Sequence, residues 1–292
     1  MKAPLIIQIY RFVLHLRLHY QFLVLSGGYL AATLIVPIET PNLYWLQFIN
    51  VHVLLFGGAT VYNSYWDKDE GPIGGLKHPP KMEQWMLFGA WVFQLIGVIW
   101  AFQVNTLFVV IYSCSAMLFW LYSSPKYRWK GHPWLSMIAI GGSTGLASLL
   151  LGTLAAGHSI SWITGIAALG VACVMLSLYP ASQVYQKEED EKRGDQTFAI
   201  IYGLKGIKLN FYFLFPIGLI ALAVGMYTRH IWGALIFFAV GNLIYLVLGF
   251  WVSRLKGVAY EYVQVMKIKF IASFGFVAFI LSWLLLQSIN TG

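Results

Sequence analysis

The chain has 292 residues, of which 59% are hydrophobic, 17% are aromatic and only 10% are charged. Soluble domains carry about 25% charged residues, so this composition excludes an ordinary soluble protein and predicts an integral membrane protein. The formal net charge of +8 is accompanied by no nucleic-acid-binding motif, so we expect no nucleic-acid partner. We expect the basic loops to contact anionic membrane lipids instead.

The first 19 residues differ from the apolar runs that follow them. Basic and histidine residues from Arg11 onwards interrupt the apolar stretch 5–20, before it reaches the length of a signal-peptide core. Because apolar and basic residues interleave here, we expect residues 1–19 to form an amphipathic helix in the membrane interface. A poorly ordered basic tail is the alternative.

Hydropathy predicts an all-α membrane protein, with nine transmembrane helices in a single domain of residues 1–292. An odd number of spans places the two termini on opposite sides of the membrane. The expected spans are residues 20–38, 44–62, 85–102, 106–122, 134–156, 160–180, 210–227, 231–252 and 269–286.

The charged residues are distributed unevenly over the connections between these spans. One alternating set of connections holds every Lys and Arg except Arg229, and every acid except Glu39. Because positive residues mark the cytoplasmic side, we expect a cytoplasmic N-terminus and a C-terminus on the opposite side. The set comprises the N-terminus and residues 63–84, 123–133, 181–209 and 253–268, together with Lys269.

One pattern occurs twice, each time after an apolar run. Val-Tyr precedes an amide residue, and a carboxylate follows the amide by four positions. The pairs are Asn63 with Asp67 and Gln186 with Asp190. Positions i and i+4 share a helix face, so we expect each pair to lie side by side at the water end of a membrane helix. Two such faces turned toward each other suit a hard cation and its phosphates. The two copies also indicate a parallel internal repeat.

The loops 63–84 and 181–209, which carry the two copies, are the expected cytoplasmic active-site loops. Acids beside bases suit a metal–diphosphate ligand, since acids hold Mg²⁺ and bases neutralise the remaining phosphate oxygens. Glu188, Glu189, Glu191 and Lys192, taken singly, are expected to be solvated loop charges. A third loop, residues 122–130, adds a cationic patch, which serves equally well as a positive-inside anchor or as a phosphate contact.

These stretches resemble the UbiA superfamily of intramembrane prenyltransferases, whose members have nine transmembrane helices and aspartate-rich motifs after helices two and six. Asn63 and Asp67 match the first motif, Asn-x-x-x-Asp-x-x-x-Asp, but Gly71 stands at its third position. In the second motif, Asp-x-x-x-Asp, Gln186 replaces the first acid and Asp190 matches the second. The third loop resembles the family segment Tyr-Ser/Thr-x-Pro-x-Lys/Arg.

The resemblance implies Mg²⁺-dependent transfer of a prenyl group from an isoprenoid diphosphate to a lipophilic, often aromatic, acceptor at the cytoplasmic side. It implies catalytic roles for Asn63, Asp67, Gln186 and Asp190. Expected Mg²⁺ ligands are these four residues with Asp69, Glu70 and Asp195. Expected diphosphate contacts are Lys77, Lys126, Arg128, Lys130, Arg193 and Lys205.

The missing carboxylates at Gly71 and Gln186 leave room for replacement by neighbours. Asp69 and Glu70 are candidates to substitute in the first motif, and Glu189 and Asp195 in the second. One alternative function is a UbiA-type terpene cyclase, and another is a UbiA fold that has lost catalysis. A transporter or lipid-binding protein is a further alternative, although transporters usually place polar residues near the bilayer midplane.

Overall fold

The computed structural model describes residues 3–291, with side chains at all of these positions except 259 and 287–291. Apart from an isolated bridge between Ile73 and Leu76, the described residues contain no β-structure. Within the described chain, nine helices are long and apolar enough to cross a membrane. They are Leu5–Ile35, Pro41–Asp67, Gln84–Ala101, Thr106–Ser123, Pro133–Ala155, Trp162–Gln183, Phe198–Tyr227, Ile231–Ser253 and Tyr262–Leu286. The all-α class and the nine spans predicted from the sequence are confirmed.

Several spans are built from consecutive helical segments. The first comprises α1 (Leu5–Leu16), α2 (Leu18–Tyr20), η1 (Gln21–Leu25), α3 (Ser26–Leu30) and α4 (Ala32–Ile35). The second comprises α5 (Pro41–Ile49), η2 (Asn50–Gly57) and α6 (Gly58–Asp67). The third and fourth are α7 (Gln84–Ala101) and α8 (Thr106–Ser123), and the fifth comprises α9 (Pro133–Ile140), η4 (Gly141–Leu146) and α10 (Ala147–Ala155).

The sixth to ninth spans follow. They are α11 (Trp162–Leu178) with the 3₁₀ turn η5 (Pro180–Gln183), α13 (Phe198–Tyr227), α14 (Ile231–Ser253) and α15 (Tyr262–Thr291). Three short elements lie in the connections: η3 (Trp129–Gly131), α12 (Lys187–Arg193) and η6 (Ala259–Glu261).

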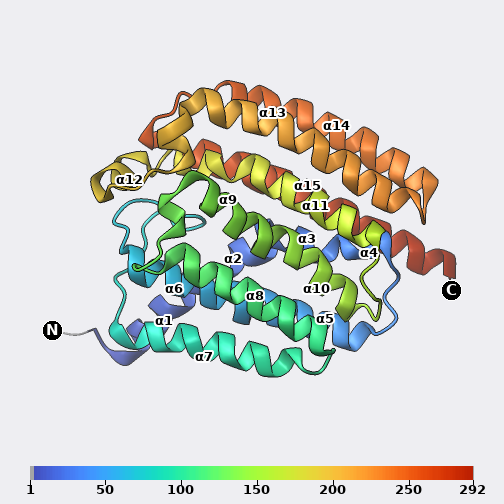
Figure 1. Cartoon of the computed structure of the whole chain (residues 1–292), viewed down its shortest axis with the longest axis horizontal. Helices are drawn as coiled ribbons and strands as arrows, with labels where there is room; N and C mark the ends of the chain where they lie inside the picture. Colours follow the sequence, from blue (N-terminus) through green and yellow to red (C-terminus); the bar gives the residue numbers. More distant parts are fainter. Residues whose placement is uncertain (1–2, 292) are drawn as a thin grey trace.

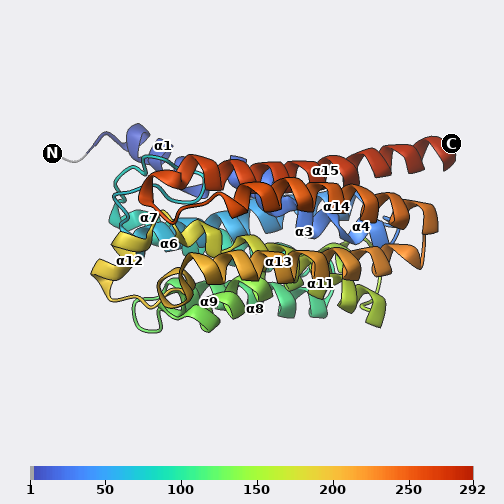
Figure 2. The ribbon, with the colours of Figure 1, turned by 90° about the horizontal axis from the view of Figure 1, so that it is seen from above.

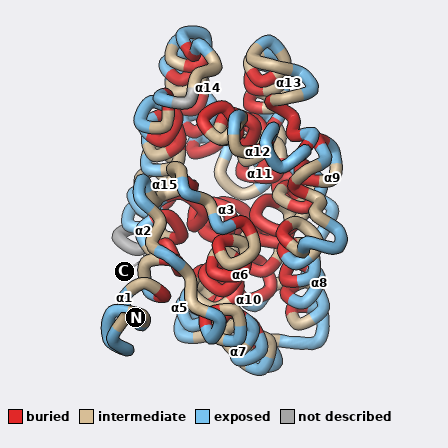
Figure 3. Tube along the Cα trace, turned by 90° about the vertical axis from the view of Figure 1, so that its left-hand side faces the viewer, coloured by how far each residue is buried: buried red, intermediate tan, exposed pale blue. Residues whose placement is uncertain are grey.

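The helices lie side by side in one bundle, and the two ends of the bundle differ in character. Figures 1 and 2 show the N-terminus, α12 and the long loops at one end and the C-terminus at the other. In the end-on view of Figure 3, buried positions gather inside the ring of helices while exposed positions lie on its outside. Many of the exposed positions are large and apolar, such as Phe88, Leu95 and Phe213, as expected for helices that face lipid. The polar loops therefore cap one end of an apolar bundle.

Backbone breaks shape the ends of the spans. Arg17 adopts a left-handed conformation with φ 50° and separates α1 from the rest of the first span. Phe12 and Leu16 of α1 are buried, while Ile6 and Tyr10 are exposed. A separate amphipathic helix was predicted here, and its location in the membrane interface stays a prediction. The helix that was predicted to begin at residue 210 is preceded by a further helical segment that begins at residue 198. The two segments meet at a kink at Gly203, which has φ 57° and ψ −168°.

Three spans contain π-helical segments, namely η1, η2 and η4. Such segments are rare and occur often at functional sites, because they redirect side chains relative to the flanking α-helix. Val24 and Leu25 of η1 and Thr144 of η4 line the central cavity described below. Asn50 joins the second, third and fourth spans: it accepts a hydrogen bond from the hydroxyl of Tyr112 at 3.1 Å and donates one to the carbonyl of Gly97 at 3.0 Å. Contacts of this kind fix helix pairing in a membrane.

Candidate functional site

A deep cavity opens at the end of the bundle that carries α12 and the long loops. Its mouth is polar and its interior is apolar. The polar lining residues include Arg17, Asn63, Asp67, Asp69, Lys130, Gln186, Asp190 and Lys269. The apolar walls include Val24, Leu25, Phe119, Val171, Met175, Phe215, Leu219, Leu222, Phe237, Phe276 and Phe279. On α15 the lining extends from Lys269 to Phe279, which is about 15 Å of helix at about 1.5 Å per residue.

The first copy of the repeated pattern lies on the last turn of α6. Asn63 and Asp67 are neighbours on one helix face, as predicted, and Asn63 Nδ2 donates to Asp67 Oδ2 at 2.6 Å. The same amide nitrogen donates to Ser123 Oγ at 3.0 Å. Both contacts use the nitrogen of Asn63, which lines the cavity mouth, so its amide oxygen is left as a possible ligand.

Asp67 is the most heavily paired acid of the site. It is 7% exposed, and its Oδ2 lies 2.6 Å from Lys130 Nζ. Its Oδ1 lies 3.8 Å from a guanidinium nitrogen of Arg128 and accepts no hydrogen bond within the described part of the chain. A buried carboxylate oxygen without a donor is costly unless another ligand compensates for it.

The second copy of the pattern does not lie at the end of a membrane helix, contrary to the prediction. α11 ends at Leu178, and Pro180, which lacks an N–H group, begins the 3₁₀ turn η5. Gln186 then caps the separate helix α12, and Asp190 N donates to the carbonyl of Gln186 at 2.9 Å. The amide and the carboxylate still line the same cavity mouth.

Asp190 differs from Asp67 in having no charged partner in contact. It is 7% exposed and forms no ion pair with the described basic side chains. Burial raises the pKa of Asp190 to about 7, against the opposing effect of nearby Lys130. A carboxyl group with a pKa near neutrality at the mouth of a cavity is typical of a functional site.

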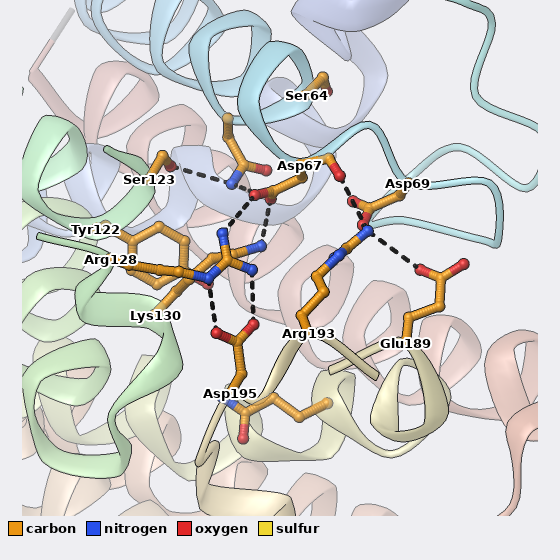
Figure 4. Close-up of polar contacts among 12 residues, drawn as sticks. Ser64, Asp67, Asp69, Tyr122, Ser123, Arg128, Lys130, Glu189, Arg193 and Asp195 are labelled. Atoms are coloured by element: carbon orange, nitrogen blue, oxygen red, sulfur yellow. Dashed lines mark hydrogen bonds and ion pairs between the residues drawn. The ribbon is translucent and has the colours of Figure 1, made fainter. Parts of the chain in front are cut away.

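Two arginines join the three loops at the cavity mouth (Figure 4). Arg128 forms two parallel hydrogen bonds with Asp195, at 2.6 and 2.7 Å, and this hydrogen bonding raises the pKa of Arg128. Arg193 lies 2.7 Å from Asp69 and donates to the carbonyl oxygen of Asp67 at 2.9 Å. Bidentate and charge-assisted contacts of this kind are strong and directional. They hold the loops in a fixed arrangement around the mouth.

Glu189 also joins two loops, although as a single residue it was expected to be a solvated charge. Its Oε1 accepts a hydrogen bond from the backbone N–H of Gly71 at 2.9 Å. A Cβ atom at position 71 would lie 2.9 Å from the same oxygen, which is closer than real Cβ contacts. A side chain at position 71 would therefore require the carboxylate of Glu189 to shift.

The structure does not bring every predicted site residue to the cavity. Glu70, Lys77, Lys126 and Lys205 are exposed and do not line it, so their expected roles stay predictions without structural support. Arg128, Arg193 and Asp195 lie beside the mouth and act on it through the contacts described above. Sequence reasoning assigned no site role to several lining residues: Arg17, Tyr20, Tyr122, Tyr179, Tyr185 and Lys269. Tyr122 and Tyr185 belong to the recognised motifs but were given no role of their own, whereas Arg17, Tyr20, Tyr179 and Lys269 lie on spans and turns outside these motifs, where no local spacing marks them.

The donor atoms at the mouth fit Mg²⁺ in their chemistry. No group of three His, Cys, Asp or Glu side chains among the described residues converges on a single point. The available atoms are the amide oxygens of Asn63 and Gln186 and the carboxylates of Asp67 and Asp190, which are hard oxygen ligands. Two observations favour a cation here. Oδ1 of Asp67 accepts no hydrogen bond from the described residues, and the carboxylate of Asp190 forms no ion pair with them.

Solved structures with the same fold were found over nearly the whole chain. A UbiA homologue from Archaeoglobus fulgidus bound to GPP and Mg²⁺ is 16% identical, with a TM-score of 0.69 over 93% of this chain and 98% of that one. A structure of a UbiA homologue from Archaeoglobus fulgidus bound to Cd²⁺ gives a TM-score of 0.68 at 15% identity, over 91% of this chain and 96% of that one.

A structure described as giving insights into digeranylgeranylglyceryl phosphate synthase in membranes gives a TM-score of 0.66 at 18% identity, over 94% of this chain and 98% of that one. None of the curated proteins compared with the chain matches it. The model of the UbiA prenyltransferase family matches residues 22–271, which is most of the chain. The chain therefore belongs to the UbiA prenyltransferase family.

Proposed function

We propose that this protein transfers a prenyl group from an isoprenoid diphosphate to a lipophilic, often aromatic, acceptor in a Mg²⁺-dependent reaction at the cytoplasmic side of the membrane. The observation that carries the proposal is that Asp67, at the end of α6, and Asp190, on α12, line the mouth of one cavity whose interior is apolar. A diphosphate head and a hydrocarbon tail require this combination of surroundings. The similar structure bound to GPP and Mg²⁺ supports the same assignment.

The polar mouth would bind the diphosphate. Asn63, Asp67, Gln186 and Asp190 would hold Mg²⁺, with Asp69 beside them. Bound Mg²⁺ neutralises negative charge that develops on the departing diphosphate. Lys130, whose ammonium is held 2.6 Å from Asp67, is placed to donate to the phosphate oxygens.

The apolar interior would bind the prenyl tail. Its walls include aromatic rings, such as those of Phe119, Phe215 and Phe276. The π faces of such rings would stabilise the short-lived allylic cation of the reaction. In the reaction the allylic C–O bond breaks and its electron pair leaves with the diphosphate. The acceptor then forms a bond to the allylic carbon and loses a proton. The walls exclude water, which would otherwise capture the allylic cation.

A transporter is less well supported by the distribution of polar groups. The carboxylates and amides gather at one end of the cavity, and its deeper walls are apolar. Transporters in contrast bind their cargo near the bilayer midplane with polar groups on broken helices.

Diphosphate release tests the proposal. The full chain in nanodiscs would receive geranyl, farnesyl and geranylgeranyl diphosphates, with and without Mg²⁺, and with phenolic and lipid acceptors added in turn. Release that requires both Mg²⁺ and an acceptor, with a prenylated product, is the expected result. Release without an acceptor and with a cyclic product would show a terpene cyclase. Directional solute uptake into vesicles without any product would overturn the enzymatic assignment.

A further inference from the structure

The helix α1 exposes a continuous apolar face at the end of the bundle that carries the long loops (Figure 1), and Figure 3 shows it at the periphery of the bundle. Five large hydrophobic side chains on this face keep between 43% and 72% of their surface exposed: Leu5, Ile6, Ile9, Tyr10 and Val13. On an α-helix these positions form one stripe along the axis. An exposed apolar patch of this kind marks a surface that lipid or protein covers.

The polar face of α1 contacts the rest of the protein, which is the reverse of the orientation expected for a helix that borders water. Its side chains contact loop 68–83, which connects α6 to α7, and the start of α7. These contacts join Gln8 to Trp85 at 2.7 Å, Arg11 to Glu83 at 4.0 Å and His15 to the carbonyl of Pro80 at 2.8 Å. The open side of α1 is therefore its apolar side, and the surroundings that suit it are the boundary between head groups and acyl chains of a bilayer.

The contacts with loop 68–83 continue where the chain leaves α1. His19 Nε2 donates to the carbonyl of Gly75 at 2.7 Å, and the guanidinium of Arg17 donates to the carbonyl of Gly74 at 3.3 Å. Gly75 has φ 83°, and a Cβ atom there would lie 3.0 Å from the same nitrogen of His19. The turn of the loop is therefore fitted closely against the first span.

This turn reaches the central cavity. Ile73 and Leu76, on either side of Gly74 and Gly75, exchange two backbone hydrogen bonds of 2.9 Å. Ile73 is 2% exposed and lines the cavity. Asp69 of the same loop also lines the cavity. A displacement of α1 would therefore be transmitted to the cavity mouth through the loop that it holds.

The first span is long enough to cross the membrane without α1. Residues 18–35 measure about 27 Å at about 1.5 Å per residue, which is close to the thickness of a hydrocarbon core of about 30 Å. The left-handed backbone of Arg17, with φ 50°, separates these residues from α1. This break allows α1 to lie at an angle to the span, with its apolar face in the membrane interface.

The loop that α1 holds also carries unpaired positive charge. Lys77 and Lys81 are exposed, and neither forms an ion pair with another described residue. Residues 71–82 include no acid that would neutralise them. Basic side chains beside an amphipathic helix complement the negative head groups of anionic lipids.

We propose that the interface of an anionic membrane leaflet covers the apolar face of α1, that Lys77 and Lys81 contact its lipid head groups, and that this docking holds loop 68–83 at the cavity mouth. Lipid is thus the partner of this surface, and the charge of the lipid controls how well the loop is ordered. The proposal goes beyond prenyl transfer, because it concerns the position of the loop and does not depend on the reaction.

Quenching of a dye on α1 by labelled lipids tests the docking. The full chain with Cys114→Ala, Cys173→Ala and Ile6→Cys would carry an environment-sensitive NBD dye at position 6, in nanodiscs whose lipids bear a nitroxide near the head group. We expect blue-shifted emission that the nitroxide lipids quench. The same dye at Glu191→Cys, an exposed position of α12, is the control and should stay unquenched.

Hydrogen exchange of loop 68–83 tests whether the docking holds the loop. Three backbone N–H groups of the loop are hydrogen-bonded, those of Gly71, Ile73 and Leu76. Their exchange, followed by mass spectrometry in nanodiscs, therefore reports opening of the loop. Ile6→Glu combined with Ile9→Glu should accelerate this exchange about ten-fold and leave that of α11 unchanged. Tyr260→Glu, which places the same charge at an exposed site of another loop, is the matched control.

The dependence on lipid charge tests the role of the two lysines. In the unmodified chain, exchange of the loop should be several-fold slower in nanodiscs that contain phosphatidylglycerol than in nanodiscs of phosphatidylcholine alone. Lys77→Gln combined with Lys81→Gln should remove this difference. The matched control, Lys192→Gln combined with Lys256→Gln, removes two exposed lysines of other connections and should preserve it.

Three results would overturn the proposal: no quenching at position 6, unchanged loop exchange after Ile6→Glu with Ile9→Glu, or equal loop exchange of the unmodified chain in both lipids. Blue-shifted emission without quenching would show that protein, such as a second copy of the chain, covers α1, and would also overturn it. Faster exchange by the same factor in both lipids after the double lysine substitution would overturn the contact of these lysines with lipid. Because no substrate is present in these measurements, their outcome is separate from that of the test of prenyl transfer.

Discussion

The backbone N–H of Gly71 donates a hydrogen bond to Oε1 of Glu189 at 2.9 Å, and through this contact the two loops that carry the repeated motif meet. A carboxylate of the second loop thus occupies the space into which a side chain at position 71 would project. Arg193 lies 3.9 Å from the same carboxylate and 2.7 Å from Asp69. One acid of each loop, Asp69 and Glu189, therefore lies next to the same guanidinium.

Gly71→Asp is expected to lower the rate of diphosphate release at least about ten-fold, because the new side chain meets Glu189 and places two carboxylates together. The double variant Gly71→Asp with Glu189→Ala is expected to recover much of the loss, since the clash and the repulsion are removed together. The rate of Mg²⁺-dependent diphosphate release measures both effects. Glu191→Ala, which changes an exposed acid of the same short helix, is the control. Failure of the double variant to improve on Gly71→Asp would show that position 71 tolerates no side chain for another reason.

Asp69→Asn is expected to raise the Mg²⁺ concentration needed for half-maximal diphosphate release several-fold, whereas Glu70→Gln leaves it unchanged. Asp69 lines the cavity and pairs with Arg193, but Glu70 is exposed and does not line it. A Mg²⁺ titration of the two variants against the unmodified chain makes the comparison. An equal effect of both substitutions would contradict the placement of these neighbouring acids.

The Mg²⁺ affinity of the donor-bound protein is expected to depend on pH through Asp190. Burial raises the pKa of this carboxyl to about 7, and a metal ligand must be deprotonated, so protons compete with Mg²⁺ below that pH. Apparent Mg²⁺ affinity should therefore increase from pH 6 to pH 7 and level off above it, with a total change of about ten-fold between pH 6 and pH 8. Titrations with Mg²⁺ at fixed pH values measure this. In Asp190→Asn the affinity should be lower at every pH, and this pH dependence should be absent.

Arg128 and Asp195 are expected to act as one unit. Their two hydrogen bonds of 2.6 and 2.7 Å join the third loop to the second, so either Arg128→Lys or Asp195→Asn breaks the same contact. A double-mutant cycle on the affinity for farnesyl thiodiphosphate should give a coupling energy of about 1–3 kcal/mol. Additive effects of the two substitutions would mean that the contact does not shape the donor site.

The termini are expected on opposite sides of the membrane, with the N-terminus in the cytoplasm. Figure 1 shows the two termini at opposite ends of the bundle, and the basic residues gather at the N-terminal end. Protease protection of N-terminal and C-terminal epitope tags in inside-out vesicles tests this arrangement. Cleavage of both tags from the same side would contradict it.

The sequence predicted the parts of the structure that depend on local pattern. Apolar runs located all nine spans, and the spacing of Asn63 and Asp67 predicted their contact on α6. The predicted position of the second motif was wrong, because it depends on a turn. The membrane helix ends before Pro180, and Gln186 and Asp190 therefore lie on a separate short helix.

The sequence also gave no indication of contacts between distant spans. Arg17 resembled one more basic residue of an interfacial helix, and Lys269 resembled a loop charge. Only the packing of the first span against the ninth places both residues in one cavity wall. Similarly, no spacing rule connects Glu189 with Gly71 across 118 positions of the chain.

The ion pair between Lys130 and Asp67 has a consequence for the order in which ligands bind. A free metal ion that approaches Asp67 has to displace an ammonium that is already 2.6 Å away, and the displaced charge would remain buried without a partner. A metal ion that arrives with a diphosphate supplies phosphate oxygens to which Lys130 can transfer its hydrogen bonds. Metal and diphosphate are therefore expected to raise each other's affinity, and by linkage the coupling is the same in both directions. The internal ion pair is expected to favour binding of the metal–diphosphate complex over binding of either component alone.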